Sequence, residues 1–103
     1  MIENPEKRRT QLRRYNLKTK YGLSLEEYDA ILIEQNGRCK ICKKLPEEVS
    51  RRKNRLEPLT VDHKQDIIRG LLCYHCNVGL GNFLDDPNLL RAAIEYLEGS
   101  ENY

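Results

Sequence analysis

The sequence predicts one small α+β domain in which helices flank a short β-hairpin and four cysteines hold the core together. The first observation is composition: of 103 residues, 39% are hydrophobic and 33% are charged, with one Phe and no Trp, so the apolar core must be modest. The second is that the four cysteines form two C-x-x-C pairs. A domain with so small an apolar core usually needs a cross-link of this kind. The third is a pair of short apolar runs around a polar turn, which is typical of a hairpin.

Two helices are expected before the first cysteine pair. Residues 5–20 are strongly basic with few apolar anchors, so a helix there would be marginal on its own in water. Residues 24–36 carry a stronger signal, because Ser24 and Glu27 have the spacing of a capping box and Asn36-Gly37 supplies a stop. Helical spacing predicts a buried stripe of Leu25, Tyr28, Ile31 and Leu32.

The hairpin is expected between the two cysteine pairs. Residues 46–58 are polar and charged and are bounded by prolines, which predicts a surface loop. Strands are expected over 59–61 and 67–72, with a turn near 64–66. Arg69-Gly70 interrupts the apolar pattern of the second strand.

Two further helices are expected after the hairpin. One covers residues 74–84 and starts at the second cysteine pair. The next has Asp86 as its N-cap and Pro87 at its first position, and it ends at Gly99. Its apolar stripe is predicted to be core and consists of Leu89, Leu90, Ala93, Ile94 and Leu97.

The four cysteines predict a structural zinc site. Cys39 and Cys42 form one pair and Cys73 and Cys76 the other, with 30 residues between the pairs. Either pair alone could be a redox motif, but two pairs complete the closed tetrahedral sulfur shell of structural Zn2+. Such a shell leaves no open position for a substrate, so chemistry must lie elsewhere. No secretory signal precedes the domain, so we expect a reducing cytosol, where four cysteines favour a metal over disulfides.

The charge distribution predicts a polyanionic partner and excludes a membrane span. Residues 1–20 hold seven Lys/Arg against two Glu, residues 43–55 six against two, and residues 83–103 one Arg against five Asp/Glu. No apolar run approaches the ~20 residues that a membrane helix needs. Basic segments of this kind grip nucleic-acid phosphates, although they can also be merely solvated faces. The expected phosphate contacts are Arg8, Arg9, Arg13, Arg14, Arg51, Arg52 and Lys53.

Three polar residues are placed where they could form a small site. Asp62 and His63 follow the first predicted strand, and Asn77 directly follows Cys76. If zinc fixes both cysteine pairs, the hairpin brings these residues towards one another. Each also has an ordinary structural role open to it: an Asx turn, a surface histidine and a helix N-cap, respectively.

The chain resembles the HNH endonucleases and, within them, the phage recombination endonuclease VII group. The resemblance covers about residues 21–98 and is carried by Tyr21–Tyr28, Asn36-Gly37-Arg38-Cys39, Val61-Asp62-His63, Arg69-Gly70-Leu71-Leu72-Cys73, Cys76-Asn77 and Asp85-Asp86-Pro87. It implies a ββα-metal (His-Me finger) core with flanking helices. It also implies two parts, a basic N-terminal helical segment over 1–20 and the endonuclease domain over 21–103.

The resemblance implies a phosphodiester hydrolase acting on DNA. Asp62 and Asn77 would hold a catalytic Mg2+ or Mn2+, His63 would be the general base, and the four cysteines would hold Zn2+. Relatives carry a further His or Asp soon after the Asp-His pair, whereas this chain has Lys64-Gln65-Asp66 in a shorter loop. The third ligand of the catalytic metal is therefore left open, as is the choice among junctions, duplexes and single strands.

The sequence also gives expectations about assembly, location and competing functions. Resolution of branched DNA needs two symmetric active sites and hence a homodimer, for which helices 5–20 and 87–98 are the candidates. If the chain is phage-encoded, the cytoplasm is that of the host. The competing interpretations are a non-catalytic zinc-held DNA-binding module and a zinc-ribbon adaptor that binds protein.

Overall fold

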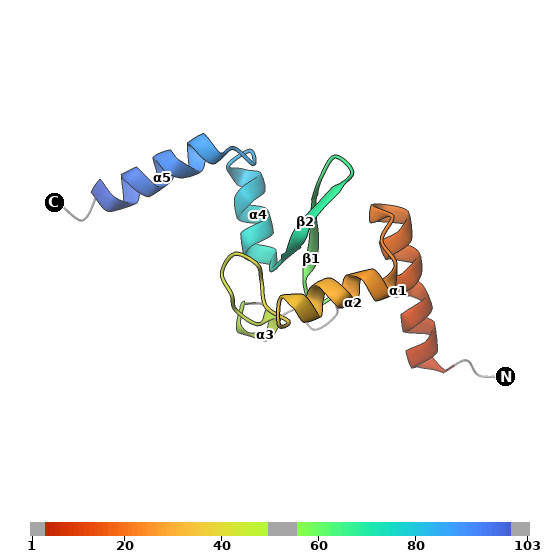
Figure 1. Ribbon diagram of the computed structural model, residues 1–103. Coiled ribbons are helices and arrows are strands. Elements are labelled where there is room, and N and C mark those ends of the chain that lie inside the picture. Colours follow the sequence, from red (N-terminus) through yellow and green to blue (C-terminus); the bar gives the residue numbers. More distant parts are fainter. Residues whose placement is uncertain (1–3, 50–55, 100–103) are drawn as a thin grey trace.

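A two-stranded antiparallel hairpin lies at the centre of the fold, with helices on both sides of it in sequence and in space (Figure 1). The computed structural model describes residues 4–49 and 56–99. Along the chain the elements are α1 (Pro5–Tyr21), α2 (Leu25–Glu34), α3 (Pro46–Val49), β1 (Thr60–Lys64), β2 (Ile67–Leu72), α4 (Tyr74–Asn82) and α5 (Pro87–Gly99). The small α+β fold predicted from the sequence is confirmed.

The hairpin contains a bulge at the position where the sequence pattern is interrupted. Asp62 pairs with Gly70 and His63 pairs with Ile68, so Arg69 is the extra residue on β2. Gly70 has a φ of 157°, and a Cβ there would meet the Lys40 side chain at 2.7 Å. This backbone conformation and close approach explain why a glycine follows the arginine.

The core joins the first two helices to the hairpin and the first cysteine. Tyr28 is fully buried, and its hydroxyl donates to the Leu59 carbonyl at 2.7 Å and accepts from the Leu59 N–H at 3.2 Å. Burial raises the pKa of Tyr28, so the hydroxyl stays protonated and can donate. The buried residues are Leu17, Leu23, Leu25, Tyr28, Cys39, Leu59, Val61, Leu71, Leu72 and Cys73.

Local signals set the starts of α2 and α5 as predicted, whereas α2 ends at Glu34, two residues before the predicted stop. The capping box of α2 is present, with Ser24 Oγ accepting from the Glu27 N–H and Glu27 accepting from the Ser24 N–H, both at 3.0 Å. Gly22 ends α1 in the left-handed conformation at φ 65°. Asp86 accepts from the Asn88 N–H at 2.8 Å, as an N-cap of α5 should.

Two predictions about the outer segments are wrong. Residues 46–58 are not entirely loop, because α3 forms one helical turn within them, and residues 50–55 lie outside the described residues. The stripe on α5 is not core: Leu89 is 40% exposed and Ile94 53%, and no residue of α5 is buried. Figure 1 shows the reason, since α5 runs away from the hairpin and no other element of the described ranges covers it.

The described chain is elongated as a result, with extents of 67 × 29 × 22 Å. No helix in the described ranges is both long and apolar enough to cross a membrane.

Candidate active site and metal centre

The four cysteines converge from two separate turns. The Sγ atoms of Cys39, Cys42, Cys73 and Cys76 all lie within 4.8 Å of one another. Those of Cys42 and Cys73 are 3.8 Å apart. A tetrahedron with zinc–sulfur bonds of about 2.3 Å has edges of about 3.8 Å, so this arrangement fits a metal ion. The four cysteines therefore come together as the sequence predicted, in a cluster that could hold a metal ion and is called the metal-binding cluster below.

Backbone geometry prepares both cysteine turns. The Lys43 N–H donates to the Cys39 carbonyl at 3.0 Å, and Lys43 has a φ of 65°, which closes the first turn. Cys73 is the N-cap of α4, and its Sγ accepts from the Cys76 N–H at 3.5 Å. The second turn is therefore also the junction between β2 and α4.

The pKa values of two of the cysteine thiols are shifted in opposite directions. Burial opposes ionisation of Cys39, but hydrogen bonds from the backbone of residues 41, 42 and 73 lower the pKa of its thiol to about 6. Burial and then the neighbouring Cys73 and Cys39 raise the pKa of Cys76. Four thiolates at this spacing repel one another, so all four can ionise together only around a cation.

Asp62 lies on β1 in a network of charged side chains. Its carboxylate accepts two hydrogen bonds from Arg69, at 2.8 Å from Nε and 3.0 Å from Nη2. The same guanidinium donates to Asp85, at 3.0 Å from Nη1 and 2.9 Å from Nη2. Hydrogen bonds from Arg69 lower the pKa of Asp85, and those to Asp85 and Asp62 raise the pKa of Arg69.

His63 follows Asp62 on β1 and is exposed. Its ring meets that of Tyr21 edge to face, with centroids 5.2 Å apart and planes at 70°. It borders an open groove of about 490 Å³ between the end of α1 and the hairpin turn. The other lining residues are Lys18, Thr19, Lys20, Tyr21, Gly22, Gln65, Asp66 and Ile68.

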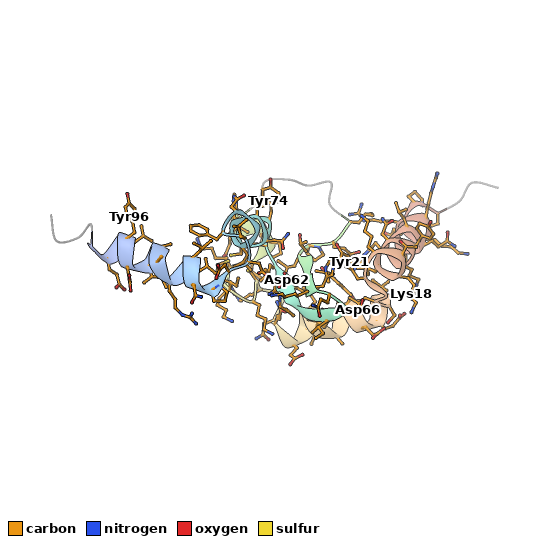
Figure 2. The ribbon with its side chains drawn as sticks, turned by 90° about the horizontal axis from the view of Figure 1, so that it is seen from above. Lys18, Tyr21, Asp62, Asp66, Tyr74 and Tyr96 are labelled. Atoms are coloured by element: carbon orange, nitrogen blue, oxygen red, sulfur yellow. The ribbon has the colours of Figure 1, made fainter. Side chains whose placement is uncertain are left out.

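Figure 2 shows Tyr21, Asp62 and Asp66 gathered around the hairpin, whereas Tyr96 lies far out on α5.

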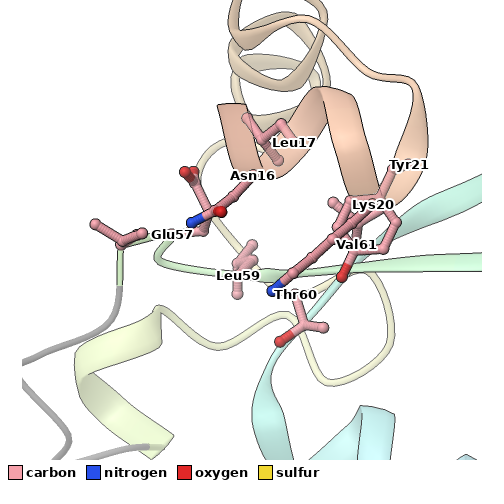
Figure 3. A pocket seen from close by; sticks show the side chains of 9 residues that line it. Asn16, Leu17, Lys20, Tyr21, Glu57, Leu59, Thr60 and Val61 are labelled. Atoms are coloured by element: carbon pink, nitrogen blue, oxygen red, sulfur yellow. The ribbon is translucent and has the colours of Figure 1, made fainter. Parts of the chain in front are cut away.

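A second pocket of about 300 Å³ lies between α1 and β1 (Figure 3). Leu17, Leu59 and Val61 make much of its wall, and Tyr21 separates it from the groove at His63. Lys20 lines both hollows, but only the groove adds Lys18 and the His63 imidazole, whereas the second pocket adds Glu57, so the groove is the better match to an anion.

Asn77 lies in the first turns of α4, half-buried, with its N–H donating to the Cys73 carbonyl at 3.0 Å. It is not the helix N-cap, because Cys73 takes that position. Helix α4 packs against β1, so the three polar residues come from elements in contact. Asp62 contacts Arg69, which also binds the α4–α5 junction at Asp85, whereas His63 contacts Tyr21 of α1.

The predicted phosphate contacts divide into three groups. Arg13 donates to both carboxylate oxygens of Glu57 at 2.8 and 2.9 Å, and Arg14 pairs with Glu26 at 2.7 Å. Arg8 and Arg9 are exposed. Arg51, Arg52 and Lys53 lie outside the described residues.

Sequence reasoning missed Arg69, Asp85, Lys18 and Lys20 as site residues. The interruption of the second strand by Arg69-Gly70 was the one local sign of the network, since a charged residue before glycine in a strand marks a bulge. The two lysines were visible only as part of a basic run.

Comparisons with known proteins agree with this geometry. The model of the recombination endonuclease VII family matches residues 14–99. Two relatives are named Gene 59 protein: that of Mycobacterium phage D29 is 44% identical over 78 residues, and that of Mycobacterium phage L5 is 42% identical over 78 residues. Each alignment covers 75% of this chain but 44% of the relative, so the chain spans less than half the length of these curated relatives.

No solved structure matches the chain significantly. The family match starts inside α1, and the predicted boundary after residue 20 stays a prediction. Since the match extends from α1 to the end of α5 and includes the hairpin and both cysteine turns, this chain belongs to the recombination endonuclease VII family.

Proposed function

We propose that this chain hydrolyses DNA phosphodiester bonds by an HNH-type, divalent-metal-dependent mechanism, with Zn2+ bound by the four cysteines. One observation carries the proposal. Within a member of an endonuclease family, Asp62 and His63 sit on a strand packed against α4, which carries Asn77 and begins at the metal-binding cluster.

Zinc in this proposal is structural. Its four ligands would all be thiolates, which is the closed shell of structural sites. Binding would lock the turn after α2 to the junction of β2 and α4, and so hold Asn77 against β1. The catalytic residues are then positioned by an ion that takes no part in the reaction.

The oxygen donors suit a hard catalytic cation. The Asp62 carboxylate and the Asn77 amide oxygen are the ligand types that Mg2+ and Mn2+ prefer. Such a cation would neutralise charge developing on the scissile phosphate and on the departing 3′ oxygen. These two residues hold the cation, and no third protein ligand is assigned.

His63 is the proposed general base. An imidazole accepts a proton readily near neutral pH, and this one is exposed at a groove with Lys18 and Lys20 at its border. The lysines would draw the phosphate backbone towards the ring. His63 would take a proton from the attacking water at a ring nitrogen as the water oxygen bonds to phosphorus. The bond from phosphorus to the 3′ oxygen would break, and that oxygen would take a proton from solvent water, which leaves a 5′ phosphate and a 3′ hydroxyl.

Supercoiled plasmid tests the proposed activity. We expect zinc-loaded protein to convert the plasmid to nicked circles when Mg2+ is supplied. We expect no conversion when Mg2+ is left out of the buffer, with no chelator added. Retardation on a gel with no conversion would establish the non-catalytic DNA-binding module instead. Absence of any DNA affinity at low salt would favour the protein-binding adaptor. A four-way junction beside linear duplex of the same sequence then distinguishes branched from unbranched substrates.

The basic residues are proposed to differ in role, which gives a matched pair of variants. Arg8→Ala should weaken DNA binding at all sequences and reduce the slope of affinity against salt by about 1. Arg13→Ala should instead lower the free energy of unfolding by about 1–2 kcal/mol, because Glu57 loses two charged hydrogen bonds. Salt titrations of DNA binding and urea unfolding measure the two effects. Weakened DNA binding by Arg13→Ala at unchanged stability would contradict this division.

A homodimer is the proposed assembly, with the apolar face of α5 as its contact. This face includes Leu89 and Ile94, which are 40% and 53% exposed, and helix α5 has nothing packed along it in the described chain. Pairing with the same face of a second copy would bury it and give two symmetric active sites.

Ile94→Asp tests this contact against Ala92→Asp, which places the same charge on the other side of α5. We expect Ile94→Asp to be monomeric and Ala92→Asp to remain dimeric in analytical ultracentrifugation. A monomeric parent chain would show that α5 is covered by something other than a second copy, such as further sequence like that present in the longer relatives. The cytoplasm of a bacterial host, where the DNA substrate lies, is the proposed place of action.

A further inference from the structure

We propose that Arg69 is an intramolecular competitor of the catalytic cation: its guanidinium occupies the Asp62 carboxylate and must leave it before the cation binds. The inference rests on the proposed role of Asp62 as a metal ligand and assigns to Arg69 control over when that ligand is available. Asp85 keeps hold of the guanidinium throughout.

The contacts at Asp62 support competition. Arg69 donates to both carboxylate oxygens, at 2.8 and 3.0 Å. A guanidinium in this side-by-side arrangement takes the lone pairs that a cation would approach. A cation on the remaining lone pairs would sit within a few ångströms of the positive guanidinium, and the two would repel each other.

The Asp62 carboxylate is partly shielded from water, so it needs Arg69 beside it when no cation is bound. The Asp62 side chain is 14% exposed, against 37% for Arg69 and 32% for Asp85. A carboxylate so shielded needs a positive partner, because water cannot solvate it fully. Arg69 fills that need within the described chain, and a divalent cation would fill it equally well.

The backbone aims Arg69 at this position. It is the extra residue of the bulge, and a bulge redirects the side chain that it carries. Lys40 Nζ donates to the Arg69 carbonyl at 3.0 Å, and Gly70 allows the close approach of the Lys40 side chain. The placement of Arg69 is therefore built into the hairpin and into the first cysteine turn.

Asp85 gives the guanidinium somewhere to stay when Asp62 is taken. It accepts from Nη1 and Nη2 at 3.0 and 2.9 Å, so Arg69 need only rotate away from Asp62. Asp85 itself is held at the α4–α5 junction, where its N–H donates to the Leu80 carbonyl at 2.8 Å and its φ is 55°.

Binding of Mn2+ alone, measured by the loss of the free-ion electron paramagnetic resonance signal, tests the inference without any cleavage assay. We expect Arg69→Gln to bind Mn2+ about tenfold more tightly than the parent, the size of effect expected when a nearby positive charge at a partly exposed site is removed. Arg69→Lys, which keeps the charge but loses the paired geometry, should fall between the two. Equal or weaker binding by folded Arg69→Gln would overturn the inference.

Asp85→Asn is the matched control. It breaks the same link to the α4–α5 junction as Arg69→Gln but leaves the guanidinium on Asp62, so its Mn2+ affinity should not rise. A rise equal to that of Arg69→Gln would mean that loosening of the junction, not competition, governs binding, and would also overturn the inference. Should Arg69→Gln fail to fold, Arg69→Lys against Asp85→Asn decides the question in the same way.

Asp62→Ala separates this inference from the proposed function. Alanine is used for this purpose because asparagine would keep an amide oxygen of the kind assigned to Asn77. If Asp62→Ala binds Mn2+ as the parent does, Asp62 is not a metal ligand and the proposed site is wrong. If Asp62→Ala loses Mn2+ binding while Arg69→Gln matches the parent, the proposed site stands and the competition does not.

Discussion

His63→Ala is expected to lower the rate of plasmid cleavage by about 100- to 10,000-fold, the range that a positioned general base contributes. Zinc content, thermal unfolding and affinity for DNA should stay close to those of the parent chain. The reason lies in the surroundings of the ring. It is exposed and its aromatic contact is with Tyr21, so little of the fold depends on it.

The second histidine of the chain is the matched control. His75 lies on α4 between two cysteines of the cluster and is exposed, with an edge contact to Tyr74. It borders neither the groove at His63 nor the network at Asp62, so His75→Ala should cleave at the parent rate. Single-turnover kinetics on one supercoiled plasmid substrate would measure both variants. Full activity of His63→Ala, or equal losses in the two variants, would contradict the role of His63.

Cys73→Ser is expected to abolish zinc binding and with it the cooperative unfolding transition. Structural zinc contributes about 10–16 kcal/mol in small domains, which equals or exceeds the usual total stability of about 5–15 kcal/mol. The core here is small, and two of its ten buried members are themselves cysteines of the cluster. Without the metal, the remaining contacts are not expected to hold the hairpin against α2.

Serine makes this a selective substitution. Cys73 is also the N-cap of α4, and serine is among the best N-cap residues, so the cap survives while the metal ligand is lost. Ser24→Ala provides the converse control, because it removes the cap of α2 at a cost of about 1 kcal/mol and leaves the cluster intact. Zinc content by mass spectrometry and unfolding by circular dichroism distinguish the two. A cooperative transition of parental size in zinc-free Cys73→Ser would contradict the structural role.

Chelation and acid should act in the same direction as Cys73→Ser. A chelator should melt the fold, and Zn2+ but not Mg2+ should restore it. Metal binding requires thiolates, so lowering the pH protonates them, releases the metal and reduces stability. Stability is therefore expected to be present at neutral pH and to be lost on acidification.

Local rules account for the features that the sequence predicted well. The capping box at Ser24, the N-cap at Asp86 and the two C-x-x-C turns each depend on groups within a few residues of one another. The hairpin followed from two apolar runs with a turn between them. The metal-binding cluster was predictable because its ligand spacing leaves few other arrangements.

Long-range pairing explains what could not be predicted. The stripe on α5 has the spacing of a core helix, but periodicity shows only that one face is apolar and not which element covers it. Likewise the basic run of α1 gives no sign that Arg13 is paired with Glu57, 44 residues away. Charge predicts an attraction to anions, and only proximity decides whether the anion is an internal carboxylate.

By itself the sequence determined the order of the helices and strands other than α3, the four-cysteine cluster and the family to which the chain belongs. Tertiary structure alone decided that Arg69 joins Asp62 to Asp85, that His63 faces the end of α1, and that the apolar face of α5 is left exposed. The physical reason is how far apart in the sequence the interacting groups lie. Caps, turns and ligand pairs act between neighbours in the chain, whereas ion pairs and packing act between neighbours in space.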